Sequence, residues 1–274
     1  MATSGSRDFE PDVAEYIEEA FERCGLEFRT GYDGVTARRS LNLLFADWAN
    51  RGLNQWTIEQ TSITMATGIR DYPGGTVAMT VASSASFSVS ETITGGTSAA
   101  IASITSKPSA TSLALTIPSG TFQATETITG GTSGATTTVS AAVDLSDVRS
   151  TIDILSAVVT RDGTDFQIER VSRSSYLNIP NKDQSARPNQ FFLDRQITPI
   201  LRVWPTPDKD TDVIKFDRLT RIDDADANTD TVDVPFRFYP CLTAGLAYYI
   251  SMKRNPGMMA VLKQVYEEEM QRAM

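Results

Sequence analysis

An eight-residue repeat constrains the middle of this chain more than any other feature of its sequence. The segment ETITGGTS occupies Glu91–Ser98 and recurs at Glu126–Ser133, 35 residues later. Phe87 and Phe122 stand at the same distance before the two copies. Short alternating apolar runs flank both copies, and Gly-Gly between β-branched residues is typical of a β-hairpin. Each repeat is therefore predicted to form about three short strands, and the pair to form a small sandwich or barrel.

The composition of residues 78–143 separates them from the rest of the chain. Ser, Thr, Ala and Gly dominate, and the only charged residues are Glu91, Lys107 and Glu126. Such a tract is either a folded insertion or a disordered or glycosylated stalk. The apolar positions keep their register in both copies, which a structureless linker would not require. We therefore interpret residues 78–143 as an inserted all-β domain, entered from the turn-like segment DYPGGT (Asp71–Thr76).

The N-terminal part of the chain carries two helix patterns. The first covers residues 12–24, where Asp12 and Glu15 have the spacing of a capping box. The second lies in TARRSLNLLFADWANRGLNQW (Thr36–Trp56), whose apolar residues recur on one side of a helix. The short connection of residues 27–32 predicts that the two helices form an antiparallel hairpin.

The second helix pattern has apolar residues on two faces. Asp33 is expected to cap its start and Gly52 to end it. Leu43 points away from the main stripe, on the face that also carries Arg39. Such a helix needs two partners, and the second is either another part of the same chain or another subunit. Arg38 and Arg39 likewise fit either a solvated face that pairs with local acids or an intersubunit salt bridge.

The region after the insertion is predicted to be β-structure followed by two helices. Asp162-Gly163 between two apolar runs indicates a hairpin, with further strands after it. A helix is expected from near Asp233 to about Lys253, and a final helix over residues 258–274. Four residues form the apolar side of the final helix: Leu262, Val265, Tyr266 and Met270.

Several catalytic and metal-binding classes are excluded by composition. The chain has no histidine, which excludes a Ser-His-Asp triad and any His-ligated metal site. Cys24 and Cys241 cannot build a zinc site and are expected to be buried thiols rather than a disulfide. Asp224–Asp230 alternates oxygen ligands as a calcium loop does, but Thr229 and Pro235 stand where that loop needs Gly and Glu. We predict no metal and no cofactor.

The charge and hydropathy of the chain bear on its partners and its compartment. The formal net charge is −9, so the protein as a whole repels a phosphate backbone. An acidic channel would nevertheless let DNA slide through without sticking. No apolar run approaches the roughly 18 residues that span a bilayer. The N-terminal MATSGSRDFEPD lacks the features of a signal peptide, so we expect a soluble protein made in a cytoplasm.

The chain resembles a family in several segments that occur in a fixed order. ARRSLNLLFADWANRGLNQW, followed by TIE and preceded by EYIEEAFERCGL, resembles the head-to-tail adaptors of short-tailed bacteriophages. These adaptors are also called tail accessory factors or packaged-DNA stabilisation proteins. Four downstream segments continue the resemblance: VSRSSYLNIPNK (Val171–Lys182), ARPNQFFLDRQ (Ala186–Gln196), LRVWPTPD (Leu201–Asp208) and DVPFRFYPCLTAGLAYYIS (Asp233–Ser251). Between Tyr72 and Asp144 nothing resembles the family.

The helix and strand patterns predict an α+β fold, and the resemblance implies a structural protein without enzymatic activity. Residues 1–77 and 144–274 are expected to form one helical adaptor core, with an N-terminal helical hairpin, C-terminal helices and a central β region. The inserted repeat domain of residues 78–143 would interrupt this core. In the virion, at the head-tail junction, copies would form a homo-oligomeric ring of twelve subunits beneath the portal protein.

The resemblance also implies the ring's partners and contacts. The ring would close the packaged head, extend the channel through which DNA leaves without sequence-specific binding, and carry the tail nozzle or hub protein and tail fibres. No membrane is involved. We expect Arg38, Arg39 and Leu43 at the subunit interface. The C-terminal segment is expected to dock on the portal through Leu262, Val265, Tyr266 and Met270.

Two other functions compete with the adaptor interpretation. The first is a carbohydrate-binding or adhesion module that acts through the β insertion, where only Phe87 and Phe122 could stack on a sugar. The second is a cell-wall glycosidase that uses a pair of carboxylates. The 34 acidic residues always offer such pairs, so their presence alone says little.

Overall fold

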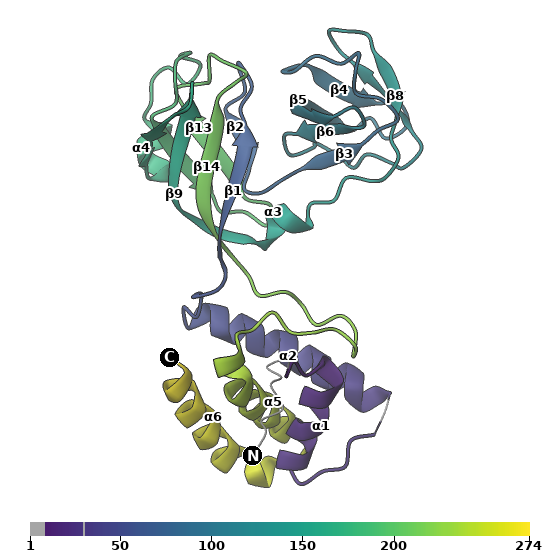
Figure 1. Ribbon diagram of the computed structural model, residues 1–274, viewed down its shortest axis with the longest axis vertical. Coiled ribbons are helices and arrows are strands. Elements are labelled where there is room, and N and C mark those ends of the chain that lie inside the picture. The colour runs from purple at the N-terminus through teal and green to yellow at the C-terminus, as the bar shows by residue number, and fades with distance from the viewer. Residues whose placement is uncertain (1–8, 30) are drawn as a thin grey trace, which may run out of the picture. The chain divides into compact units, whose positions relative to one another are not determined.

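The computed structural model describes residues 9–29 and 31–274 (Figure 1). The chain divides into two compact units, which are considered separately. The helical unit consists of Met1–Thr57 together with Arg221–Met274. The β unit consists of Ile58–Thr220.

The helical unit is built around one central helix. Its four long helices are α1 (Val13–Arg23), α2 (Tyr32–Asn50), α5 (Tyr239–Arg254) and α6 (Met259–Ala273). Short 3-10 turns, Phe236–Phe238 and Pro256–Met258, precede α5 and α6. Helix α5 is buried along most of its length, and α1, α2 and α6 all pack on it. An apolar helix of this kind needs cover on several sides, which explains its central position.

The prediction of a helical core that opens with an N-terminal hairpin is wrong. In the described part of the chain, fourteen strands in three sheets accompany the six α-helices, so the protein is rich in β-structure. Helices α1 and α2 pack mainly on α5 rather than on each other. The short connection between them does not decide their packing, because α5 offers each apolar stripe a larger buried surface. The assignment to the α+β class itself stands.

The helix ends agree only in part with the sequence. The capping box of α1 is confirmed, with the Glu15 amide donating to Asp12 Oδ1 at 2.9 Å and the Asp12 amide to Glu15 Oε2 at 3.1 Å. Gly52 follows α2 with a positive φ of 76°, as predicted. Asp33 is not the cap of α2, however, because the helix begins at Tyr32 and Asp33 lies in its first turn. Similarly, Asp233 does not cap α5, which begins six residues later at Tyr239 after a 3-10 turn.

Two four-stranded sheets of the β unit enclose one apolar core. The first has the order β1 (Ile58–Thr64), β14 (Val213–Thr220), β9 (Thr151–Arg161), β10 (Thr164–Gln167). The second has the order β11 (Glu169–Arg170), β12 (Gln190–Asp194), β13 (Ile200–Trp204), β2 (Asp71–Pro73). Side chains such as Val159 and Phe216 from the first sheet meet Phe191 and Val203 from the second. The helices α3 (Ser146–Ser150) and α4 (Arg173–Leu177) are single short turns.

The predicted hairpin at Asp162-Gly163 is confirmed. Strands β9 and β10 pair antiparallel on either side of it. Asp162 and Gly163 both have positive φ, 52° and 78°. This is the backbone form that a two-residue hairpin turn requires.

The repeated segment forms a sheet of its own. Its order is β3 (Ala78–Thr80), β6 (Ser112–Leu115), β5 (Ile101–Ser109), β4 (Thr92–Gly95), β7 (Thr127–Gly130), β8 (Thr136–Thr138). A bridge between Val81 and Val139 joins the last strand to the first, which closes the sheet into a small barrel. Each copy of the repeat supplies three strands, and both Phe87 and Phe122 are buried in the common core.

The two copies of ETITGGTS form reciprocal hydrogen bonds. Glu91 accepts hydrogen bonds from the amide and hydroxyl of Ser133, at 3.0 and 2.8 Å. Glu126 accepts the equivalent bonds from Ser98, at 3.0 and 2.8 Å. Each buried carboxylate thus satisfies the backbone of the turn in the other repeat, which explains why the same eight residues occur twice.

Candidate assembly surfaces

The structure holds no site suited to metal or thiol chemistry in residues 9–29 and 31–274. No cluster of three or more metal-ligating side chains occurs there. Both cysteines are buried free thiols. Burial raises the pKa of Cys24 to about 11 and that of Cys241 to about 12, which keeps both thiols protonated and unreactive.

The acidic turn of Asp224–Asp230 is a hydrogen-bonded loop. The Asp230 carboxylate accepts the backbone amides of Asp226 and Ala227, at 2.9 and 2.6 Å. Its oxygens are therefore used to fix the turn. This agrees with a solvated acidic turn rather than a calcium loop.

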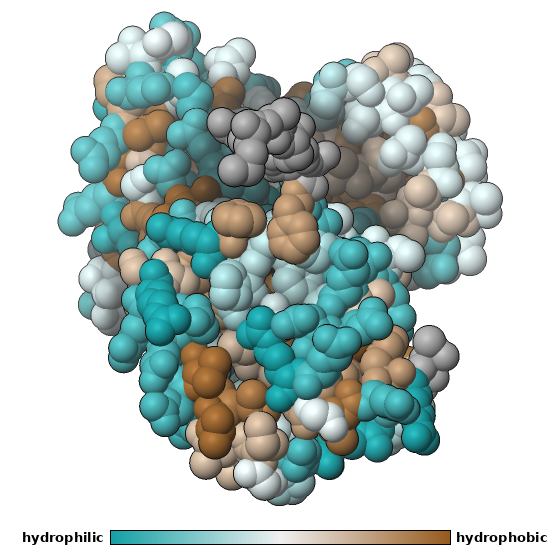
Figure 2. Space-filling model, turned by 60° about the horizontal axis from the view of Figure 1, so that its bottom comes forward, coloured by the Kyte–Doolittle hydropathy of each residue, from teal (hydrophilic) through white to brown (hydrophobic). Residues whose placement is uncertain are grey.

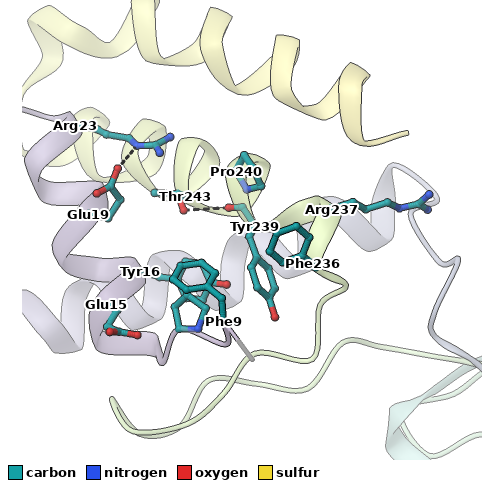
Figure 3. A pocket seen from close by; sticks show the side chains of 11 residues that line it. Phe9, Glu15, Tyr16, Glu19, Arg23, Phe236, Arg237, Tyr239, Pro240 and Thr243 are labelled. Atoms are coloured by element: carbon teal, nitrogen blue, oxygen red, sulfur yellow. Dashed lines mark hydrogen bonds and ion pairs between the residues drawn. The ribbon is translucent and has the colours of Figure 1, made fainter. Parts of the chain in front are cut away.

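A groove of about 610 Å³ lies between α1 and the start of α5 (Figure 3). Tyr239 stands at its centre, with ring centroids 5.6 Å from Tyr16, 5.4 Å from Phe236 and 6.5 Å from Phe9. All three pairs meet edge-on, a favourable arrangement for aromatic rings. Phe9 and Phe236 are 68% and 69% exposed, so apolar surface remains open to solvent at this groove. We call it the aromatic groove.

Three charged residues of the aromatic groove lie on α1, and a fourth, Arg237, lines it from the 3-10 turn before α5. Glu19 pairs with Arg23 at 2.8 Å, whereas the carboxylate of Glu15 has no ion pair with any described cation. The phenol of Tyr16 is buried and has no hydrogen-bond partner among the described residues. Burial is the main cause that raises the pKa of Tyr16, and the neighbouring Tyr239 adds to it. The groove is therefore apolar at its centre, and its charged lining residues are two glutamates and two arginines.

Helix α2 presents a second surface, opposite its buried stripe. Tyr32, Val35 and Leu43 are 76%, 49% and 53% exposed. Arg39 and Ala46 are exposed between and beyond them. At 100° per residue these five side chains fall on one stripe of the helix. We call this stripe the outer α2 face, and no described residue buries it.

The two arginines of the predicted interface have different surroundings. Arg38 is half-buried and donates to the backbone carbonyl of Asp226, so it is tied to its own chain. Arg39 is exposed and forms no ion pair in the part of the chain that the structure describes. Leu43 lies on the same face as Arg39, as the sequence predicts. The structure thus brings Arg39 and Leu43 together and separates Arg38 from them.

The four predicted docking residues of α6 do not form an exposed patch. Leu262, Tyr266 and Met270 are 6%, 1% and 3% exposed, and Val265 is half-buried. The Trp48 indole donates to the Tyr266 hydroxyl at 2.9 Å. Three of these side chains therefore belong to the core of the helical unit, and a partner could not reach them without detaching α6.

Other apolar side chains are exposed around the turn between α5 and α6: Met252, Met258, Met259 and Val261. Figure 2 turns toward the viewer the end of the helical unit that lies at the bottom of Figure 1. Hydrophobic side chains interrupt a mostly hydrophilic surface there.

The two competing functions find little support in these side chains. Phe87 and Phe122 are 3% and 0% exposed, so neither can stack on a sugar. The two carboxylates of the aromatic groove are both engaged, because Glu15 caps α1 and Glu19 pairs with Arg23.

Comparison with protein families decides the class of protein. A family model described as SU10 adaptor protein matches residues 114–274, more than half of the chain. The chain belongs to the SU10 adaptor protein family. The resemblance to phage head-tail adaptors is thereby confirmed, and the four downstream segments that carry it lie inside the matched range. No curated protein matches the chain.

Membership in the SU10 adaptor protein family places the chain among phage structural proteins rather than enzymes. It implies a place in the virion and contact with portal and tail proteins. None of the helices in the described residues combines the length and apolar character needed to cross a membrane. The matched range includes α5 and α6, whereas α1 and α2 precede it.

The aromatic groove is a surface that the sequence patterns did not predict. The segment DVPFRFYP carries the family resemblance and the predicted start of a helix, and it also holds three aromatic residues in four positions. Such a cluster at the start of a helix is the signal in the sequence, and the structure leaves Phe236 69% exposed.

Proposed function

We propose that twelve copies of this chain form a ring beneath the portal of a phage head. The ring closes the packaged head, extends the DNA channel, and carries the tail nozzle or hub protein and fibres. Membership in the SU10 adaptor protein family is the observation that carries this proposal. The protein acts by binding its partners and by the shape of the ring, and it catalyses no reaction.

Two properties of the chain support assembly into a closed ring. A ring requires two different surfaces on each subunit, so that each copy binds the next head to tail. The aromatic groove and the outer α2 face are two such surfaces. The net charge of −9 suits a channel through which DNA must slide rather than bind.

The C-terminal helix is proposed to face the portal. The side chains available for that contact are the exposed ones at its start, Met258 in the preceding turn and Met259 and Val261 in its first turn. Leu262, Tyr266 and Met270 would act indirectly, by holding α6 against α5 and α2. Replacing Val261 with Asp is expected to weaken portal binding without unfolding the protein, because Val261 is 56% exposed.

Electron microscopy of the purified protein tests the proposal. The protein is imaged alone and after mixing with portal rings of the same phage. We expect either free rings or added density beneath the portal, and class averages give the symmetry directly. A protein that stays monomeric and leaves the portal unchanged would contradict the proposed function.

A further inference from the structure

The helical unit has two uncovered surfaces that share no residue. The aromatic groove is lined by α1, the 3-10 turn before α5 and the first turn of α5. The outer α2 face consists of Tyr32, Val35, Arg39, Leu43 and Ala46, none of which lines the groove. Both surfaces belong to one compact unit, so each copy of the chain presents both together.

One surface is concave and the other is convex, as a groove and its ligand helix are. One is a hollow of about 610 Å³ with aromatic walls, and the other is a ridge on a 19-residue helix. Helices dock in apolar grooves through side chains spaced three or four positions apart. This spacing occurs on the outer α2 face at Tyr32, Val35, Arg39 and Leu43. Without a partner, each of the three apolar side chains keeps about half or more of its surface in water.

Arg39 on one surface and Glu15 on the other have opposite charges. Arg39 stands in the middle of the outer α2 face without an ion pair in residues 9–29 and 31–274. The carboxylate of Glu15 lies at the groove, where it accepts the Asp12 amide but has no ion pair with a described cation. Of the other charged lining residues, Glu19 pairs with Arg23, and Arg237 lies on the 3-10 turn. A helix laid in the groove with Arg39 toward α1 would pair Arg39 with Glu15 while burying Leu43 against the aromatic rings.

We propose that the outer α2 face of one copy docks in the aromatic groove of the next copy. The occupant of the groove is thus a second copy of this chain. The contact joins two different surfaces, so it repeats from copy to copy and closes into a ring when the rotation allows it. This inference rests on the proposed function, since it names the interface of the proposed ring.

Two single substitutions each remove one side of this contact. Leu43→Asp places a charge on the outer α2 face, and Phe236→Asp places one at the groove. Both positions are more than half exposed, so the fold is expected to persist, which circular dichroism checks. Leu177→Asp is the matched control, because Leu177 is 71% exposed on α4, outside both surfaces.

Native mass spectrometry and electron microscopy then read the assembly state. We expect rings from the wild type and from Leu177→Asp, alone or on portal rings, and monomers from each of the other two variants. An equimolar mixture of Leu43→Asp and Phe236→Asp is expected to form dimers but no rings. In such a pair the intact outer α2 face of Phe236→Asp docks in the intact groove of Leu43→Asp. The other face and the other groove both carry a substitution, so no third copy can bind.

A cross-linking measurement covers the case in which an Asp variant fails to fold. The double substitution Leu43→Cys with Phe236→Cys leaves both native cysteines buried. A short bismaleimide is expected to join its copies into a ladder of multimers, whereas either single variant stays unlinked. Wild-type-like rings of the double variant that give no ladder would overturn the interface.

The other outcomes separate the interface from the proposed function. Rings formed by either Asp variant, or a mixture of the two folded variants without dimers, would overturn the interface while leaving the ring intact. Normal rings of Phe236→Asp that no longer bind the portal would make the portal the occupant of the groove. A wild type that forms no ring with or without the portal would overturn the proposed function itself.

Discussion

At the scale of single residues, two glutamates make a Ser/Thr-rich segment fold. Glu91 and Glu126 are 4% and 5% exposed, and each accepts hydrogen bonds from the turn of the other repeat. Burial alone would raise the pKa of the Glu91 carboxyl. The hydrogen bonds that Ser133, Ser88 and Thr132 donate outweigh burial and hold this pKa below its usual value.

Replacing Glu91 with Gln is expected to destabilise the β unit by about 1.5–3 kcal/mol, the usual range for hydrogen bonds to a charged group. The amide keeps the shape but turns a donor toward the amides of Thr132 and Ser133. Chemical denaturation of the purified protein measures the change. Glu169→Gln on exposed β11 is the matched control, and an equal loss in both variants would contradict the role of the turn contact.

The depressed pKa of both glutamates predicts an acid-sensitive barrel. The pKa of the Glu126 carboxyl is lowered in the same way, since bonds from Ser98, Gln123 and Thr97 outweigh its burial. A depressed folded-state pKa gives stability that is present at neutral pH and is lost as the pH falls below the usual value of 4.5. Thermal melts between about pH 6 and pH 3 should show this loss, and Glu91→Gln should flatten it.

At the scale of helices, the packing of α5 depends on one small residue. A Cβ at Gly245 would lie 2.9 Å from both Leu44 Cδ2 on α2 and Tyr266 Cε2 on α6. Three helices therefore approach closely at this point. The close contact explains why a helix interior tolerates glycine despite its low helix propensity.

Gly245→Ala is expected to destabilise the helical unit by about 1–3 kcal/mol, the usual cost of overpacking. The added methyl gains helix propensity but must displace Leu44 or Tyr266. Thermal unfolding followed by circular dichroism measures the balance. Gly257→Ala serves as the control, because its nearest neighbour would be at 3.6 Å, and an unchanged melting temperature in Gly245→Ala would show that the helices adjust freely.

At the scale of the whole molecule, the two chain segments that enter and leave the barrel lie side by side. The Thr76 amide and hydroxyl both donate to Asp147 Oδ2 at 2.6 Å, so the two ends of the inserted segment are tied together. Neighbouring chain ends are the usual feature of an inserted domain. We propose that residues 78–143 form such a domain on the outside of the ring.

Deleting Ala78–Val143 and closing the gap with a short glycine linker should leave a folded protein that still assembles. The bond between Thr76 and Asp147 keeps the two cut ends close. Electron microscopy compares the rings of the deleted and complete chains, and the deleted ring should lack peripheral density. Loss of rings in a variant that circular dichroism finds folded would mean that the barrel takes part in assembly.

Local features of the sequence determined the parts of this protein that depend on few neighbouring residues. The capping box of Asp12 and Glu15, the end of α2 at Gly52 and the hairpin at Asp162-Gly163 all follow from such local preferences. Ordered motifs spread along the chain likewise sufficed to recognise the family.

Only the tertiary structure decided which surfaces pack inside the chain and which stay open. Leu262 and Leu43 both read as apolar residues on helices, yet one is 6% exposed and the other 53%. The difference lies in α5, which covers α6 and leaves the outer α2 face bare. Likewise Glu91 accepts a hydrogen bond from Ser133, which lies 42 positions away in the sequence. Contacts of this range depend on how whole elements pack, because burial is a property of all neighbours together and no short segment encodes it.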